Sequence, residues 1–91
     1  MADRRSARVF GAVLKRHRRA AGISQEKLAE RAGLDRTSVG LLERGQRRPG
    51  LDTILDLGDG LGLAPGRLLD ETCALLLEYS GVSSLPVGSS T

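Results

Sequence analysis

The first half of the chain holds basic and polar side chains at spacings suited to contact with a polyanion. Arg36 and Thr37 are adjacent, and the stretch 44–48, Arg-Gly-Gln-Arg-Arg, begins eight residues later. A guanidinium can donate two parallel hydrogen bonds to the O6 and N7 atoms of guanine or pair with a phosphate, and hydroxyl and amide groups bond phosphate oxygens. These residue types predict noncovalent recognition of a nucleic acid.

The charge of the chain is divided unevenly between its two halves. Residues 1–50 carry 13 of the 14 Lys and Arg residues and five of the 11 acidic residues, which gives a formal charge of +8. Residues 51–91 carry one Arg and six acidic residues, which gives −5, although the whole chain has only +3. This division indicates that the first half meets a polyanion and that the second half has another role. Charge clustering alone fits a solvated basic face equally well.

Residue counts and spacings argue against several other kinds of site. Cys73 and His17 are the only residues of their types, too few for an internal disulfide or a metal site, so we expect no metal and no cofactor. No spacing suggests a nucleophile with its base or a phosphate-binding loop, so we expect no enzyme. The chain contains no apolar run of about 18 residues and no apolar signal segment after its basic N-terminus, so we expect a cytoplasmic protein without membrane contact.

These side chains must be positioned by a small aliphatic core. Only 24 of the 91 residues are Leu, Ile, Val or Phe, and the only aromatic residues are Phe10 and Tyr79, which favours packed short helices over a β-sandwich. Apolar residues recur at helical spacing, with Ser24 and Asp35 as N-caps and glycines such as Gly33 as C-caps. We predict an all-α fold of five helices, at residues 6–21, 25–32, 36 to about 44, 51–61, and 65 to about 69 or beyond.

The end of the chain leaves alternatives open. Residues 74–79 form a short apolar run that fits either a continuation of the fifth helix or a strand. The last residues are rich in Ser and Gly, which favours a disordered tail, but Val82, Leu85 and Val87 also fit an extended segment that pairs in a dimer. We therefore divide the chain into a domain at 6–70, an extension with a dimerisation role at 71–79 and a tail at 80–91.

Residues 25–44 have the spacing of a helix-turn-helix, two helices joined by a tight turn around Gly33, with a small Ala29 where the helices cross. The inward-facing apolar residues are Leu28, Leu34, Val39 and Leu42. The outward-facing residues of the second helix are Arg36, Thr37, Gly40 and Leu41. Two segments, GISQEKLAERAGL at 22–34 and LLERGQRRP at 41–49, resemble the phage repressor and Cro, or Xre, family of helix-turn-helix transcription factors. Within that family, Leu-Asp-Arg-Thr at 34–37 most resembles the controller proteins of restriction-modification systems.

The resemblance implies a compact lambda-repressor-like domain with its second helix in the major groove of DNA. From their place on that helix we expect Arg36 and Thr37 to read bases, together with the positions of Gly40 and Leu41, where the family often has polar residues. A phosphate contact or solvation is the alternative for Arg36, a capping or phosphate-bonding hydroxyl for Thr37, and a protein contact for Leu41. The side chains expected at phosphates are Gln25, Ser38, Arg44, Gln46, Arg47 and Arg48. The resemblance also implies a partly buried structural salt bridge between Arg18 and Glu43.

Together these features predict a sequence-specific DNA-binding transcriptional regulator that binds a palindromic operator as a homodimer. Leucines in excess of the needs of the core suggest the dimer surface: Leu63, Leu68, Leu69, Leu75, Leu76 and Leu77. We expect Cys73 to be a buried apolar residue, Arg16 to be solvated or to attract DNA diffusely, and His17 to be a partly buried or surface residue without a functional role. The alternative is a protein-binding module, such as an antitoxin that neutralises a toxin, in which Leu41 or the tail docks the partner.

Overall fold

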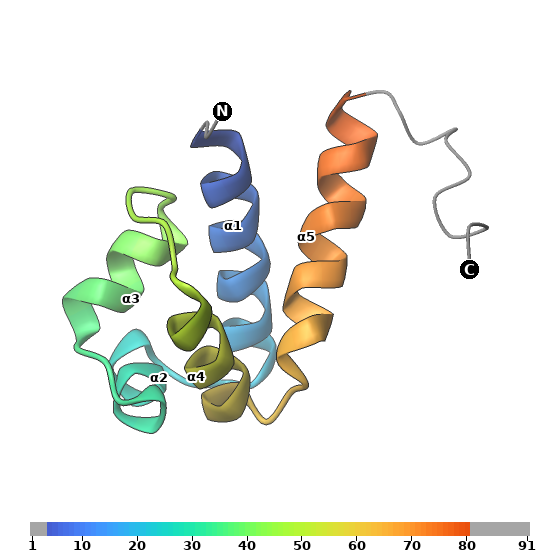
Figure 1. The fold of residues 1–91 in the computed structure, drawn as a ribbon. Coiled ribbons are helices and arrows are strands. Elements are labelled where there is room, and N and C mark those ends of the chain that lie inside the picture. Colours follow the sequence, from blue (N-terminus) through green and yellow to red (C-terminus); the bar gives the residue numbers. More distant parts are fainter. Residues whose placement is uncertain (1–3, 81–91) are drawn as a thin grey trace.

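The computed structural model describes residues 4–80, which form five α-helices and no strand (Figure 1). The helices are α1 (Arg4–Ala20), α2 (Gln25–Ala32), α3 (Arg36–Glu43), α4 (Leu51–Leu61) and α5 (Pro65–Ser80). The predicted all-α fold of five helices is confirmed. None of the helices in this part of the chain is long and apolar enough to cross a membrane. The expected tail, apart from Ser80, lies outside the described residues and stays a prediction.

Capping residues set the ends of the helices in the first half. The Ser24 Oγ atom accepts a hydrogen bond from the Lys27 N–H at 3.0 Å, which caps α2. The Asp35 Oδ1 atom accepts one from the Ser38 N–H at 2.7 Å, which caps α3. Gly33 ends α2 with a φ of 71°, a left-handed conformation that a side chain would strain. The predicted caps are present, and they fix where α3 begins.

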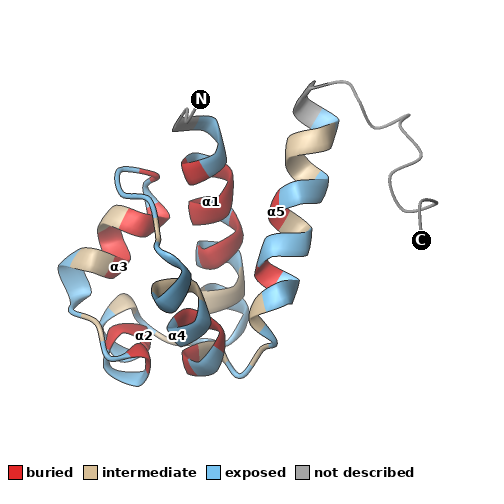
Figure 2. Ribbon diagram, in the orientation of Figure 1, coloured by how far each residue is buried: buried red, intermediate tan, exposed pale blue. Residues whose placement is uncertain are grey.

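The core lies between α1, α2, α3 and α4, and α5 packs against it from the side of α1 and α4 (Figure 2). Its largest fully buried side chains are Leu14, Leu28, Leu42, Leu57, Leu68, Val13 and Val39. Leu68 therefore belongs to the core, which corrects its expected place on a dimer surface, and Leu63 and Leu75 also pack against the core. The reason is that α5 lies along α1, so residues at helical spacing from Leu68 face inward.

Two glycines allow helices to approach each other closely. A Cβ atom at Gly11 of α1 would overlap the Leu42 carbonyl oxygen and lie 2.7 Å from that of Glu43, so α1 crosses the end of α3 in direct backbone contact. A Cβ atom at Gly60 of α4 would lie 3.2 Å from Leu28 Cδ1, so α4 packs closely on α2. These two crossings hold the helix-turn-helix against the rest of the domain and thereby position the outer face of α3.

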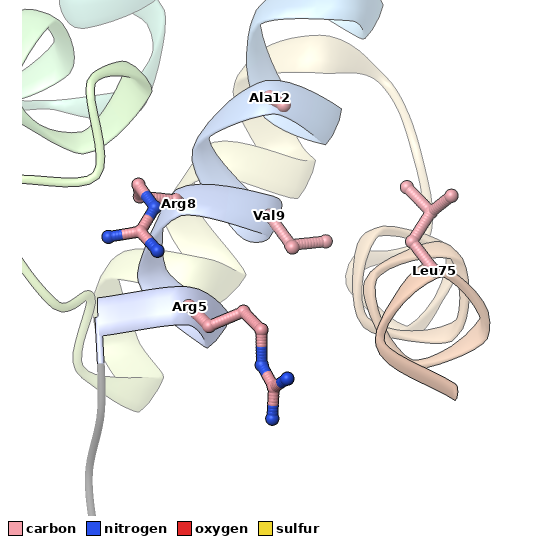
Figure 3. A pocket seen from close by; sticks show the side chains of 5 residues that line it. All are labelled: Arg5, Arg8, Val9, Ala12 and Leu75. Carbon is pink, nitrogen blue, oxygen red and sulfur yellow. The ribbon is translucent and has the colours of Figure 1, made fainter. Parts of the chain in front are cut away.

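The extension at residues 71–79 continues α5, so it is a helix and not a strand. This part of α5 runs antiparallel beside α1 (Figure 1). A groove remains between the two helices, where the Val9 and Leu75 side chains lie on opposite sides (Figure 3). Its lining is completed by Arg5, Arg8 and Ala12. Cys73 is exposed, which corrects the expectation of a buried residue, because its side of α5 faces away from the core.

Candidate nucleic-acid interface

Helices α2 and α3 form the predicted helix-turn-helix. Ala29 of α2 and Val39 of α3 are buried, and the N–H of Leu34 in the turn donates to the Ala29 carbonyl oxygen at 2.8 Å. Helix α3 lies at the edge of the domain, away from α5 (Figure 1). One face of α3 is therefore open to solvent, and it carries Arg36 and Thr37 as exposed side chains.

A buried ion pair locks the end of α3 to α1. The Arg18 Nε atom donates to Glu43 Oε2 at 2.6 Å, and the Arg18 Nη2 atom donates to Glu43 Oε1 at 3.1 Å. Both side chains are shielded, since only 11% of Arg18 and 2% of Glu43 is exposed. A third donor, Arg18 Nη1, bonds the Ile23 carbonyl oxygen at 2.8 Å, just before α2. The ion pair that the family resemblance implies is thus present, and it joins α1, α3 and the start of α2.

The same carboxylate holds Gln25. The Gln25 Nε2 atom donates to Glu43 Oε1 at 2.9 Å, so the hydrogen bond sets which way the amide is turned. The Gln25 Oε1 atom lies 3.8 Å from the position of a Cβ atom on Gly40, which places the amide beside α3. The Gln25 amide, which we expect to bind a phosphate, is therefore positioned by the buried carboxylate of Glu43 at the C-terminal end of α3.

Gly40 lies beneath the side chains of its neighbours. It is buried, and the Arg44 Nη1 atom lies 3.3 Å from the position of a Cβ atom on Gly40. The Arg44 Nε atom also donates to Gln46 Oε1 at 3.2 Å. The outward position of Gly40 is thus covered by Arg44, an exposed cation, while Leu41 beside it is half-buried.

Arg47 lies against the start of α3. Its Nη1 atom donates to Ser38 Oγ at 2.9 Å, although the two residues are nine positions apart. Hydrogen bonds from the Ser38 backbone and side chain, and then the nearby Arg47 charge, hold the pKa of Asp35 below its ordinary value. Asp35, Ser38 and Arg47 therefore form one connected group at the exposed edge of the helix-turn-helix.

Arg48 stands at the boundary between two surfaces. It lines one hollow with Gln46 and Arg47, which belong to the basic loop after α3. It also lines an apolar groove with Phe10, Pro49, Ile54 and Leu69, between α1, α4 and α5. Of the side chains expected at phosphates, the structure brings five together around α3 and its loop, and it turns the sixth, Arg48, partly toward the apolar groove.

Helices α4 and α5 carry an exposed apolar surface, which comprises Leu51, Leu55 and Leu69. These leucines are 68%, 46% and 38% exposed. Leu69 lines the apolar groove, and the half-buried Leu76 follows seven residues later on the same face of α5. Large exposed apolar side chains can belong to a protein–protein interface.

Glu71 of α5 organises a group of charges that the sequence did not reveal. Its Oε1 atom is hydrogen-bonded to His17 Nε2 at 2.8 Å and contacts Arg16 Nη2, and its Oε2 atom accepts from Arg67 Nε at 3.2 Å. The hydrogen bond from His17, and then Arg67 and Arg16, hold the pKa of Glu71 below its ordinary value. Only Arg67, four residues before Glu71, gives a sequence signal, because Arg16 and His17 are 55 and 54 positions away. Arg16 and His17 thus join α1 to α5, a specific contact that was not expected of them.

No group of three side chains able to hold a metal ion forms within the described part of the chain. The site consists of the exposed face of α3, the amide of Gln25 and the basic loop after α3. Its chemistry is that of hydrogen bonding and ion pairing with an anionic ligand.

Known proteins are similar to this chain in sequence and in fold. Residues 9–72 match the family model described as a helix-turn-helix domain. The chain is 32% identical over 65 residues to the uncharacterized HTH-type transcriptional regulator y4dJ of Sinorhizobium fredii, which covers 71% of this chain and 84% of that protein. It is 46% identical over 50 residues to control protein C.BamHI of Bacillus amyloliquefaciens, which covers 55% of this chain and 62% of that protein.

A solved structure agrees with these matches. The restriction-modification controller protein C.AhdI of Aeromonas hydrophila is 47% identical, with a TM-score of 0.67 over 68% of this chain and 90% of that protein. The matched residues 9–72 include α2, α3 and the loop after α3, and therefore the whole candidate interface.

Proposed function

The chain belongs to the helix-turn-helix family of transcriptional regulators, and we propose that it binds duplex DNA sequence-specifically as a homodimer. In this proposal α3 enters the major groove with Arg36 and Thr37 toward the base edges, because the first turn of a recognition helix lies closest to the bases. The observation that carries the proposal is the open face of α3, flanked by polar and basic side chains that are already held in place.

Base and phosphate contacts divide between α3 and its surroundings. Arg36 is suited to the O6 and N7 atoms of guanine, and Thr37 and Leu41 are suited to a thymine methyl group. Gly40 has no side chain, so Arg44, which covers it, takes this part of the interface. The phosphate contacts in the proposal come from Gln25, Arg44, Gln46, Arg47 and Arg48.

The apolar surface of Leu51, Leu55 and Leu69 supports the homodimer. One helix-turn-helix reads few bases, so two copies on half-sites about one helical turn apart are needed for a palindromic operator. The segment that ends α5 adds the half-buried Leu76 and Leu77, which agrees with a dimerisation role for residues 71–79. The named relatives are a transcriptional regulator and controller proteins, which favours DNA over a toxin as the partner.

Selection of bound sites from random duplex DNA tests the proposed function. We expect a palindromic sequence, because the two copies of α3 in a symmetric dimer read the same bases on opposite strands. The affinity of the protein for the selected site should fall about 10³- to 10⁵-fold between about 50 and 200 mM salt, since the proposed dimer contacts about ten phosphates. An affinity that hardly changes with salt, or the absence of any enriched site, would contradict DNA binding.

The selected site then allows a test of Arg36. Arg36→Ala should weaken binding by about 10- to 100-fold for each half-site and reduce discrimination at one base pair of each half-site, because one bidentate contact to guanine is lost in each. The control is Arg67→Ala, which removes the same charge from the exposed surface of α5. If both variants weaken all DNA sequences alike, Arg36 does not read a base.

The homodimer is tested separately by sedimentation at micromolar concentration. Leu69→Glu should convert the dimer to a monomer, because it places a charge in the apolar surface. Ala74→Glu, at a site that is also exposed but lies on another side of α5, should leave the dimer intact. A wild-type monomer that binds the full palindrome would refute the homodimer.

A further inference from the structure

Ser38 forms two hydrogen bonds, one through its backbone and one through its side chain, and the second involves a residue that is proposed to bind DNA. Its N–H donates to the Asp35 carboxylate at 2.7 Å, and its Oγ atom accepts from Arg47 Nη1 at 2.9 Å. We propose that Ser38 is a positioning residue, which holds the Arg47 guanidinium on α3, and that it is not itself a phosphate ligand. This inference rests on the proposed function and assigns a new role to Ser38 within it.

The first argument concerns the freedom of Arg47. An arginine side chain carries about 2 kcal/mol of rotamer entropy, which it loses when it is fixed on a phosphate. Arg47 belongs to a loop and is exposed, so little packing restricts it. The hydrogen bond to Ser38 fixes the guanidinium in advance, and it uses one of five N–H donors, so the remaining donors can meet a phosphate oxygen.

The second argument concerns what holds Ser38. The carboxylate of Asp35 caps α3 through the Ser38 N–H, so the position of the hydroxyl is fixed by the helix itself. The Asp35 carboxylate lies beside the same serine that Arg47 contacts, so its negative charge also attracts the Arg47 guanidinium toward this end of α3. Arg47 is therefore fixed to the same helix that carries Arg36. The side chain proposed to bind a DNA phosphate and the side chain proposed to contact a base thus keep a constant position relative to each other.

A double-mutant cycle on the selected DNA site tests the proposal. Ser38→Ala should weaken binding about three- to tenfold when Arg47 is present, the cost of ordering one long side chain. In the Arg47→Ala background the same substitution should change binding less than twofold, because nothing is left to position. Ser38→Thr, which keeps the hydroxyl, should restore wild-type affinity. Equal losses in both backgrounds would show that Ser38 contacts DNA on its own and would overturn the proposal.

A measurement on the free protein keeps this test separate from the proposed function. The NMR order parameter of the Arg47 Nε–H group should fall in Ser38→Ala and recover in Ser38→Thr, while that of Arg48, in the same loop, should stay constant. An Arg47 side chain that is equally mobile in wild type and Ser38→Ala would overturn the positioning role even if DNA binds. Failure of the wild type to bind any DNA would instead overturn the proposed function, whatever the NMR result.

Discussion

Helix α1 is joined to α3 and to α5 by the same chemistry, a glutamate that meets basic side chains, but the two junctions differ in burial. Glu43 is 2% exposed and receives two hydrogen bonds from Arg18, whose planar guanidinium matches the carboxylate. Glu71 is 26% exposed, and its partners Arg16 and Arg67 are both more than half exposed. Water therefore competes for the second junction but hardly reaches the first.

The backbones show the same contrast. At Gly11, α1 and α3 touch without any intervening side chain. Between α1 and α5 a groove stays open, with Val9 and Leu75 on its two sides (Figure 3). The α1–α3 junction, on which the proposed DNA contacts rest, is therefore closed and buried, whereas the α1–α5 junction is partly open to solvent.

The buried junction is broken most directly by Glu43→Ala. This substitution leaves the shielded Arg18 charge without a counter-ion and removes the acceptor that orients Gln25. We expect a loss of about 3–5 kcal/mol in the free energy of unfolding, a large part of the about 5–15 kcal/mol that a small domain has. Thermal and urea denaturation followed by circular dichroism measure this loss.

The matched control is Glu30→Ala on α2. Glu30 forms an exposed pair with Lys27, at 3.3 Å, and exposed pairs contribute less than about 1 kcal/mol. Glu43→Ala should therefore destabilise the protein several times more than Glu30→Ala. Similar effects for the two variants would show that burial does not distinguish the first junction.

The backbone contact is broken by Gly11→Ala. The added methyl group would overlap the carbonyl oxygens of Leu42 and Glu43, which cannot move without displacing the end of α3. We expect a loss of about 1–3 kcal/mol, the usual cost of overpacking.

Gly66→Ala on α5 is the control for the same change. A Cβ atom there has no neighbour within 4 Å, so the gain in helix propensity should stabilise the protein by about 0.4–1 kcal/mol. If Gly11→Ala lowers the free energy of unfolding and Gly66→Ala raises it, the close backbone contact is specific to the α1–α3 junction. A neutral Gly11→Ala would mean that α1 and α3 can separate.

Helix caps and turns, which depend on residues a few positions apart in the chain, could be predicted well from the sequence. Ser24, Asp35 and Gly33 act on backbone groups a few residues away, so the start of α2 and the turn before α3 could be located from residue type alone. The strong sequence pattern around residues 22–49 also led to the correct family and to the Arg18–Glu43 pair. The four apolar positions assigned inward on α2, the turn and α3 are buried or pack against the core.

Features that depend on how distant segments meet were not predictable in the same way. Leu68 and Leu69 are adjacent, and only the docking of α5 on α1 decides that the first is core and the second is exposed. The same docking exposes Cys73 and brings Glu71 to His17. The bond between Arg47 and Ser38 depends on the path of the loop after α3, which no periodicity in the sequence records.

The exposed junction gives the smallest expected effect. Glu71→Gln removes the charge that His17, Arg67 and Arg16 stabilise, so at pH 7 we expect a loss of only about 0.2–1 kcal/mol in the free energy of unfolding. Because folding lowers the pKa of Glu71, the ionised carboxylate stabilises the folded state, and this contribution is complete above the ordinary value of 4.5 and lost as the pH falls through the lower value of the folded state. The difference between wild type and Glu71→Gln should therefore shrink as the pH is lowered from 7 to about 3.

Urea denaturation at a series of pH values measures this convergence, and Glu78→Gln, an exposed glutamate on the same helix, is the control. The Glu78 variant should match the wild type in stability at pH 7, since this exposed side chain is not one of those that bond to Glu71. If Glu71→Gln instead costs as much as Glu43→Ala, the exposed junction is as strong as the buried one. In that case α5 is fixed to α1 as firmly as α3 is, and the proposed homodimer would have to form without any movement of α5.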